Sequence, residues 1–278
     1  MDIQIKAGLR KELSAFLRSK RFLIAALVFI AISILTPLLM WGLGLLMEVT
    51  SSAYDQLGMD STGMVEEISP LFLTASSGVG MQISYLSTYG LLLYLLLMNS
   101  YAGGEQKRRS IIIPQISGLS SRAYILPKFI IYPPAVFIMS LIGVLIASLV
   151  STFIFEYNDL TFTAVLASGV VLGVFLMFFA CLHLALGTAT GKAGMSSAIC
   201  IVASMLLPSA LSIIDATPAY NPFTLSVTAT STLYGAEKAS EVIIGIIIAL
   251  AIMVAAFFIA LFVRNAKKID NSGNEVLI

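Results

Sequence analysis

The sequence predicts an all-α polytopic membrane protein with six transmembrane helices and both termini on the cytoplasmic side. The 278-residue chain is 58% hydrophobic and only 11% charged, whereas a soluble domain is typically ~45–50% apolar and ~25% charged. Several apolar stretches are long enough to cross the ~30 Å hydrocarbon core as helices. Nearly all lysines and arginines fall on one side of the resulting arrangement.

Each predicted span holds about 20 or more mostly apolar residues, the length that a transmembrane helix needs. The six spans are 22–47, 81–101, 129–155, 161–190, 195–214 and 242–263. The start of the second is the least defined, because another apolar run begins at Leu71. We treat residues 1–278 as a single transmembrane domain.

The basic residues predict the orientation, because lysine and arginine accumulate in cytoplasmic loops. Six spans place 15 of the 16 basic residues on one side and leave only Lys238 on the other. Ten of the 15 acidic residues lie on the side of Lys238, five of them in the first external loop, 48–80. Both termini are therefore expected in the cytoplasm.

The N-terminal segment 1–21 is expected to form an interfacial helix. Apolar side chains recur in it at spacings of three and four, and most cations fall on the opposite arc. The apolar stripe consists of Ile5, Leu9, Leu13, Phe16 and Leu17. This pattern is typical of a helix that lies on the bilayer with its cations near anionic headgroups.

Prolines occur in three of the predicted spans. Pro37 and Pro208 are expected to bend the first and fifth spans, and such bends serve either a pathway or simple packing. Pro133 and Pro134 are expected within about the first turn of the third span, where proline is easily tolerated.

Two glycine pairs have the small-xxx-small spacing that lets helices approach closely in lipid. They are Gly169-x-x-x-Gly173 and Gly187-x-x-x-Gly191. The spacing is compatible with packing inside one bundle and with packing across a dimer. His183, the only histidine, is expected to form a helix-to-helix hydrogen bond, because one histidine makes a poor metal site or proton relay.

No stretch predicts catalysis or nucleotide binding on this chain. "GTATGKAG" at 187–194 resembles a P-loop, but Leu186 replaces its first glycine and Ala193 replaces its final hydroxyl residue. Motifs such as H-E-x-x-H and G-x-S-x-G are missing from the sequence. We therefore expect no enzyme activity, no cofactor and no nucleic-acid partner, and any ATP chemistry must reside on another chain.

The external segment 215–241 is expected to form a re-entrant or surface-lying hairpin. It is long and only moderately polar, and it contains "TPAYNPF" at 217–223. Backbone that enters the membrane without forming a complete helix needs protein around it. A plain loop is the alternative.

The cytoplasmic loop 103–128 gathers charge in an otherwise apolar chain. Glu105 and three consecutive cations, Lys107 to Arg109, precede an isoleucine patch that Pro114 interrupts. The apolar side chains and the charges predict a short amphipathic element that docks on a partner. The alternative is a helix that rests on lipid headgroups.

Read in this order, the loop resembles that of the permease subunits of ABC exporters of the ABC-2 type. Those proteins have six spans, cytoplasmic termini, an N-terminal interfacial helix and a similar order of residues after the second span. The matching residues here are Glu105, Lys107–Arg109, Ile111–Ile113, Ser121-Arg122 and Leu126-x-Lys128. The family's proline beside the Ser-Arg pair is absent, and Pro127 stands where glycine is common. The short loop 191–194 and the "YNPF" hairpin are also similar to the family.

The resemblance implies that loop 103–128 is a cytoplasmic coupling helix seated in a cleft of a separate ATPase. The implied ATPase-coupling residues are Glu105, Lys107, Arg108, Arg109, Ile111, Ile112 and Ile116. It also implies an exporter with two ATPase copies, which bind ATP and Mg, and a second permease chain, identical or homologous. The expected location is the plasma (inner) membrane of a prokaryote.

A different class of function shares this topology. A non-transporting polytopic membrane protein, such as a sensor partner or an assembly scaffold, needs no ATPase. An intramembrane enzyme is disfavoured because the predicted spans contain no pair of polar residues suited to catalysis. A secondary transporter is disfavoured because no carboxylate lies mid-span.

Overall fold

The computed structural model describes residues 3–56, 74–104, 118–212, 220–269 and 275–277. These residues are almost entirely helical. The helices are α1 (Ile3–Leu17), α2 (Lys20–Gln56), α4 (Ala75–Tyr85), η1 (Leu86–Gly90), α5 (Leu91–Leu97), η2 (Ser100–Gly104), α8 (Ser121–Ile154), α9 (Phe162–Thr190), α10 (Ala193–Ser212), α11 (Leu225–Leu233) and α12 (Ala239–Ala266). Two short strands, β1 (Lys267–Ile269) and β2 (Glu275–Leu277), pair antiparallel near the C-terminus and were not predicted from the sequence.

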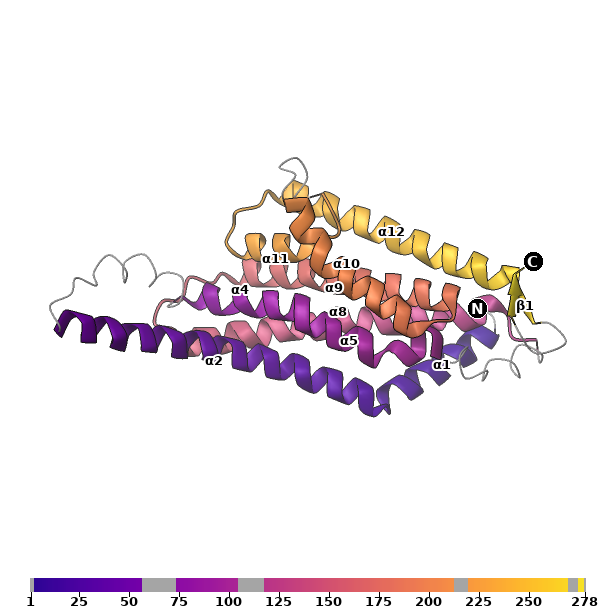
Figure 1. Ribbon diagram of the computed structural model, residues 1–278, viewed down its shortest axis with the longest axis horizontal. Coiled ribbons are helices and arrows are strands. Elements are labelled where there is room, and N and C mark those ends of the chain that lie inside the picture. The colour runs from indigo at the N-terminus through magenta and orange to yellow at the C-terminus, as the bar shows by residue number, and fades with distance from the viewer. Residues whose placement is uncertain (1–2, 57–73, 105–117, 213–219, 270–274, 278) are drawn as a thin grey trace.

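The helices form an elongated bundle with both chain termini at one end (Figure 1). The long helices α2, α8, α9 and α12 run along its length, and α1 meets α2 at a sharp bend at the termini end. We call this the termini end, and the opposite end, where α4, α9 and α12 begin, the far end.

Five helical stretches of the described chain are long and apolar enough to cross a membrane. They are Lys20–Thr50, Ala75–Gly104, Ser121–Ile154, Phe162–Thr190 and Ala239–Ala266. The predicted fifth span corresponds to α10, whose apolar stretch, Ala193–Pro208, is shorter. The prediction of a helical protein with membrane-length apolar helices is confirmed. The count of six spans and the cytoplasmic orientation stay predictions.

Helix α9 is the centre of the bundle. In an apolar stretch of 18 residues of α9, 72% of the residues are buried. The corresponding fraction is 28% in α2 and in α12. Gly169 and Gly173 lie against α8, where an added Cβ would stand 3.0 Å from Cδ1 of Leu141 and 2.6 Å from Cδ2 of Phe137, respectively. This glycine pair therefore serves packing inside one chain, which decides between the two readings of the motif.

The second membrane-length stretch combines α4, η1, α5 and η2. The π-helical segments η1 and η2 each interrupt the α-helical hydrogen-bond pattern, and such segments are frequent at functional sites. The stretch starts before and ends after the predicted 81–101 span, because helical geometry continues beyond the most apolar residues.

Helix α8 begins at Ser121, well before the predicted span start at 129, and Ser120 caps it by accepting a hydrogen bond from the Ala123 amide. The prediction for Pro133 and Pro134 was therefore wrong, because both lie in the helix interior. Neighbouring helices make such prolines tolerable in a membrane protein.

The described part of segment 215–241 contains a short helix that packs on the bundle. The ring of Phe223 lies 5.3 Å from that of Phe178 and 6.0 Å from that of Phe179 on α9, centroid to centroid. Leu225 and Ala229 of α11 are fully buried. The backbone of α11 is thus supported by protein, as a hairpin entering a membrane requires. Its location outside the membrane stays a prediction.

At the far end, Asp159 stabilises the first turn of α4. The Ser76 amide donates to Asp159 Oδ1 at 2.9 Å, and the Ser76 hydroxyl donates to Oδ2 at 2.5 Å. A carboxylate at this position is favoured by the partial positive charge of a helix N-terminus. Tyr234, after α11, donates to the Ser76 carbonyl at 3.4 Å. Burial, together with the Asp159 carboxylate, raises the pKa of Tyr234.

Candidate functional site at the termini end

The predicted coupling residues, Glu105, Lys107, Arg108, Arg109, Ile111, Ile112 and Ile116, lie outside the described residues. The structure describes both flanks of their segment, 105–117. The upstream flank ends with η2, and the downstream flank begins at Gly118 and continues into α8. The candidate site therefore consists of these flanks and the side chains that hold them in place.

The upstream flank is packed directly against the end of α9 and the start of α10. A Cβ added to Gly103 would stand 2.9 Å from the Gly187 carbonyl oxygen and 3.2 Å from the Ala193 amide nitrogen. A Cβ added to Gly187 would stand 2.6 Å from Cβ of Ala102. Glycine at both positions lets the two backbones touch, and this contact explains the first glycine of the predicted Gly187-x-x-x-Gly191 pair.

The second glycine of that pair has a different role. Gly191 ends α9 with a left-handed φ of 68°, and its amide donates to the Gly187 carbonyl at 2.9 Å. A glycine C-cap reverses the chain without steric cost. The resulting turn places the start of α10 against η2. Both glycines of the pair therefore act inside one chain.

The downstream flank is held by α1. The Gln4 side chain donates to the Gly118 carbonyl at 3.2 Å and accepts from the Ser120 amide at 3.3 Å. One side chain thus brackets the turn that precedes α8. Gly118 has a φ of 85°, which favours glycine because other residues rarely adopt that conformation.

Helix α1 also touches α8 through its backbone. A Cβ added to Gly8 would stand 2.9 Å from the Ala123 carbonyl oxygen and 3.0 Å from Cγ of Pro127. A proline provides no amide to the carbonyl four residues earlier, which here belongs to Ala123. The close approach of Gly8 covers the carbonyl that Pro127 leaves without its helical donor.

Lys128 is fully buried between α8 and η2. Its Nζ donates to the Tyr101 carbonyl at 3.0 Å and to the Tyr124 hydroxyl at 3.2 Å, and it lies 4.4 Å from the centroid of the Tyr124 ring. Arg264, near the end of α12, is 1% exposed, and its Cζ lies 5.3 Å from the same ring centroid. Both cations therefore pack around one tyrosine, an arrangement that stabilises charge removed from water.

Glu12 contributes a buried acid to the same end. It is 6% exposed, and the Tyr132 hydroxyl donates to its Oε2 at 2.6 Å. The Tyr132 ring packs on the Tyr101 ring at 4.4 Å and on the Phe16 ring at 5.1 Å. Lys11 approaches Glu12 only to 4.0 Å and is mostly exposed, so this ion pair contributes little.

We name these side chains the buried charged cluster. Its members are Glu12, Tyr101, Tyr124, Lys128, Tyr132 and Arg264. Together they connect α1, η2, α8 and α12 through hydrogen bonds and ring contacts. Hydrogen bonds and ring contacts between side chains inside a protein hold the helices that carry them in fixed positions. The cluster therefore ties both flanks of segment 105–117 to the bundle as one unit.

Sequence reasoning missed the burial of these charges. Arg264 was counted only as a cation that sets the orientation, and Lys128 as such a cation and as part of the Leu126-x-Lys128 run. The spacing of Tyr124 and Lys128, one helical turn apart, was an available signal once α8 is known to begin at Ser121. Glu12 was equally readable, because it lies three residues after Leu9 and four before Phe16, on the apolar stripe of α1.

His183 forms the predicted helix-to-helix contact. Its Nδ1 lies 3.0 Å from the Ser196 hydroxyl, which joins α9 to α10. Among the described residues, no three His, Cys, Asp or Glu side chains gather in a group that could hold a metal ion. Cys181 and Cys200 are buried and free. The described side chains of the site connect helices through hydrogen bonds and ring contacts.

Comparison with known proteins gives no match for this chain, either among protein families or among curated proteins.

Proposed function

We propose that this chain is the membrane-spanning permease subunit of an ATP-driven exporter, driven by a separate ATPase subunit that docks on segment 105–117. The working unit in this proposal contains two ATPase copies and a second permease chain, identical or homologous. Both termini and the docking segment face the cytoplasm of a prokaryote, and the permease lies in its plasma membrane.

The observation that supports the proposal is the way both flanks of the docking segment are built into the bundle. Upstream, η2 touches the backbone of the α9–α10 turn through Gly103 and Gly187. Downstream, Gln4 and Lys128 tie the start of α8 to α1 and η2. Energetic coupling between distant sites is carried by packed side chains and rigid elements. A displacement of the segment by its partner would therefore be transmitted to α1, α8, α9, α10 and α12 together.

The charge of the segment supports a protein partner. Glu105 and the cations Lys107 to Arg109 stand beside an isoleucine patch. Charge complementarity across an interface mainly determines partner choice and association rate. Apolar side chains such as Ile112 would supply the buried centre of the contact.

The test is isolation of the tagged full-length chain from membranes of its host in mild detergent. The expected result is a co-purifying soluble ATPase with a complete Walker A motif, and ATP-dependent transport after reconstitution. Arg109→Glu should weaken the association, whereas Lys238→Glu, one charge reversal outside the segment, should leave it intact. A chain that purifies alone under every condition would instead support the sensor or scaffold function. Equal association of both variants would contradict the assignment of the docking segment.

A further inference from the structure

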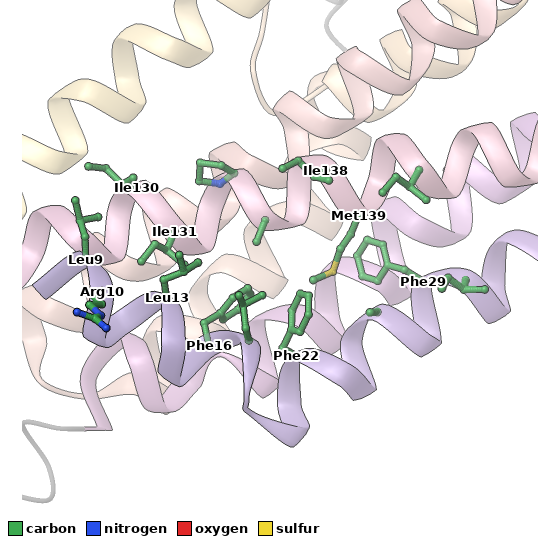
Figure 2. A pocket seen from close by; sticks show the side chains of 16 residues that line it. Leu9, Arg10, Leu13, Phe16, Phe22, Phe29, Ile130, Ile131, Ile138 and Met139 are labelled. Atoms are coloured by element: carbon green, nitrogen blue, oxygen red, sulfur yellow. The ribbon is translucent and has the colours of Figure 1, made fainter. Parts of the chain in front are cut away.

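Helices α1, α2 and α8 enclose an apolar groove of about 770 Å³ near the termini end (Figure 2). Of the sixteen described residues that line it, fifteen are apolar, and the exception is Arg10 of α1. Figure 2 shows Arg10 beside Leu9 at one end of the groove, with Phe29 and Met139 toward the other end.

The groove opens on an apolar surface of the bundle. Two of its walls, α2 and α8, are long and apolar enough to span a bilayer. Large apolar side chains on its walls are strongly exposed, among them Leu17 at 55% and Ile138 at 55%. In water such a surface would be unfavourable, but in a bilayer it faces hydrocarbon. The groove is therefore accessible to lipid chains.

The length of the groove is close to the depth of one leaflet. Along α8 its wall extends from Ile130 to Ile142, and twelve residue steps of a helix rise about 18 Å. One leaflet contributes about half of the ~30 Å hydrocarbon core, or roughly 15 Å. An acyl chain that enters beside α1 and follows α8 would thus extend through about one leaflet.

Arg10 supplies a charge at the end where the headgroups of that leaflet belong. It is exposed, and among the described residues it has no ion-pair or hydrogen-bond partner. Lys6 lies one helical turn earlier on α1 and is also exposed. The only acid of α1, Glu12, is buried and bound by Tyr132. This end of the groove is complementary to an anion.

We propose that the groove is a binding site for one anionic phospholipid, with an acyl chain between α1, α2 and α8 and its phosphate beside Arg10. The proposal requires only that the chain lies in a membrane and does not depend on transport. A bound lipid would hold α1 against α8, and α1 carries Gln4 and Glu12 of the termini end. The anionic lipid content of the membrane would then control how firmly that end is held.

The first experiment measures lipid retained by the purified full-length protein after extensive detergent washing. Native mass spectrometry should find phosphatidylglycerol bound at about one per chain and little phosphatidylcholine after exchange into an equal mixture. Arg10→Ala should lower the apparent affinity about fivefold, because a cation near an anionic surface contributes ~1 kcal/mol. Arg18→Ala, which removes an exposed cation that does not line the groove, should have no effect.

A second pair of variants tests the acyl chain. Ala26→Phe fills the groove and should remove most of the retained lipid, whereas Ala31→Phe adds the same ring to an exposed position of α2 that does not line the groove. Equal retention in all four variants, or equal retention of the two lipids by the wild type, would overturn the proposal.

A measurement on the wild-type protein avoids any dependence on variant folding. Photo-crosslinking with a diazirine-acyl phosphatidylglycerol should label peptides from residues 9–30 and 130–142, and excess unlabelled phosphatidylglycerol should suppress the labelling. Labelling spread evenly over the exposed faces of α2 and α12 would contradict a specific site. So would a crosslink between two protein chains through the groove, because a second copy would then be the occupant.

Discussion

The two ends of the bundle hold their helices together in different ways. At the termini end, Lys128, Arg264 and Glu12 are nearly or fully removed from solvent and are held by tyrosines. At the far end, the main charged contact is made by Asp159, which is exposed while it accepts two hydrogen bonds from Ser76.

This difference predicts where a substitution lowers the stability of the protein most. Hydrogen bonds to charged groups are stronger in the low dielectric of the interior, and removing one partner there leaves the other buried and unsatisfied. Water replaces a lost partner at an exposed position. Substitutions at the termini end should therefore destabilise the protein more than comparable ones at the far end.

The largest effect is expected for Lys128→Met, which keeps the length of the side chain and removes its charge. The Tyr101 carbonyl and the Tyr124 hydroxyl would lose their donor inside the protein, at a cost of about 3 kcal/mol in the free energy of unfolding. Titration with a denaturing detergent in mixed micelles measures this. Lys192→Met, an exposed cation at the same end, serves as the control, and equal losses in both variants would show that burial is not the cause.

The next largest effect is expected for Gly187→Ala at the contact between η2 and α9. The new methyl group would meet Cβ of Ala102 at 2.6 Å and its carbonyl oxygen at 2.8 Å, and such overpacking costs about 2 kcal/mol. Gly194→Ala is the matched control, because an added Cβ there has nothing within 4 Å. Alanine is the better helix former, so the control should be neutral or slightly stabilising. A neutral Gly187→Ala would disprove the close contact.

A smaller loss is expected for Asp159→Ala at the far end. It removes a carboxylate that accepts from the amide and the hydroxyl of Ser76 at the start of α4. Losing such a cap costs about 1 kcal/mol, and thermal unfolding in detergent would detect it. The loss should be smaller at high salt, because exposed charges are screened. A loss equal to that of Lys128→Met would remove the contrast between the two ends.

The smallest effect concerns Tyr234 and pH. Burial and the neighbouring Asp159 raise the pKa of Tyr234 in the folded protein above its unfolded value of about 10. Its contribution to stability is therefore fully present below about pH 10 and is lost as the pH rises through the folded pKa. The difference in unfolding midpoint between wild type and Tyr234→Phe, followed across alkaline pH, measures this term. A pH-independent difference would contradict the shift.

Apolar length and charge predicted much of the helical architecture. Each predicted span corresponds to a helix or, for 81–101, to a run of helical segments, because about 20 apolar residues satisfy their backbone groups in lipid only by forming a helix. The ends of the helices were less predictable. Helix α8 begins at Ser121 and α2 continues to Gln56, because a helix continues into polar residues as long as caps and neighbours support it.

The sequence predicts where a partner would dock, and that position stays a prediction, whereas the way its flanks are held could not be predicted. The charge and the isoleucine patch of segment 105–117 are visible in the sequence, and the segment itself lies outside the described residues. The use of Gly103 and Gly187 as a backbone contact required knowing which helices meet. The same is true of Gly169 and Gly173, whose spacing alone left a dimer contact and an internal contact equally open.

By itself, the sequence determined that the chain forms helices long and apolar enough to cross a membrane, and where its charges gather. Hydrophobic length and charge are local properties. Only the tertiary structure decided which charges are removed from water. Lys128 and Arg264 are chemically similar to the exposed cations Lys192 and Arg10, and they differ because η2, α8 and α12 converge around Tyr124. Burial depends on neighbours distant in the chain.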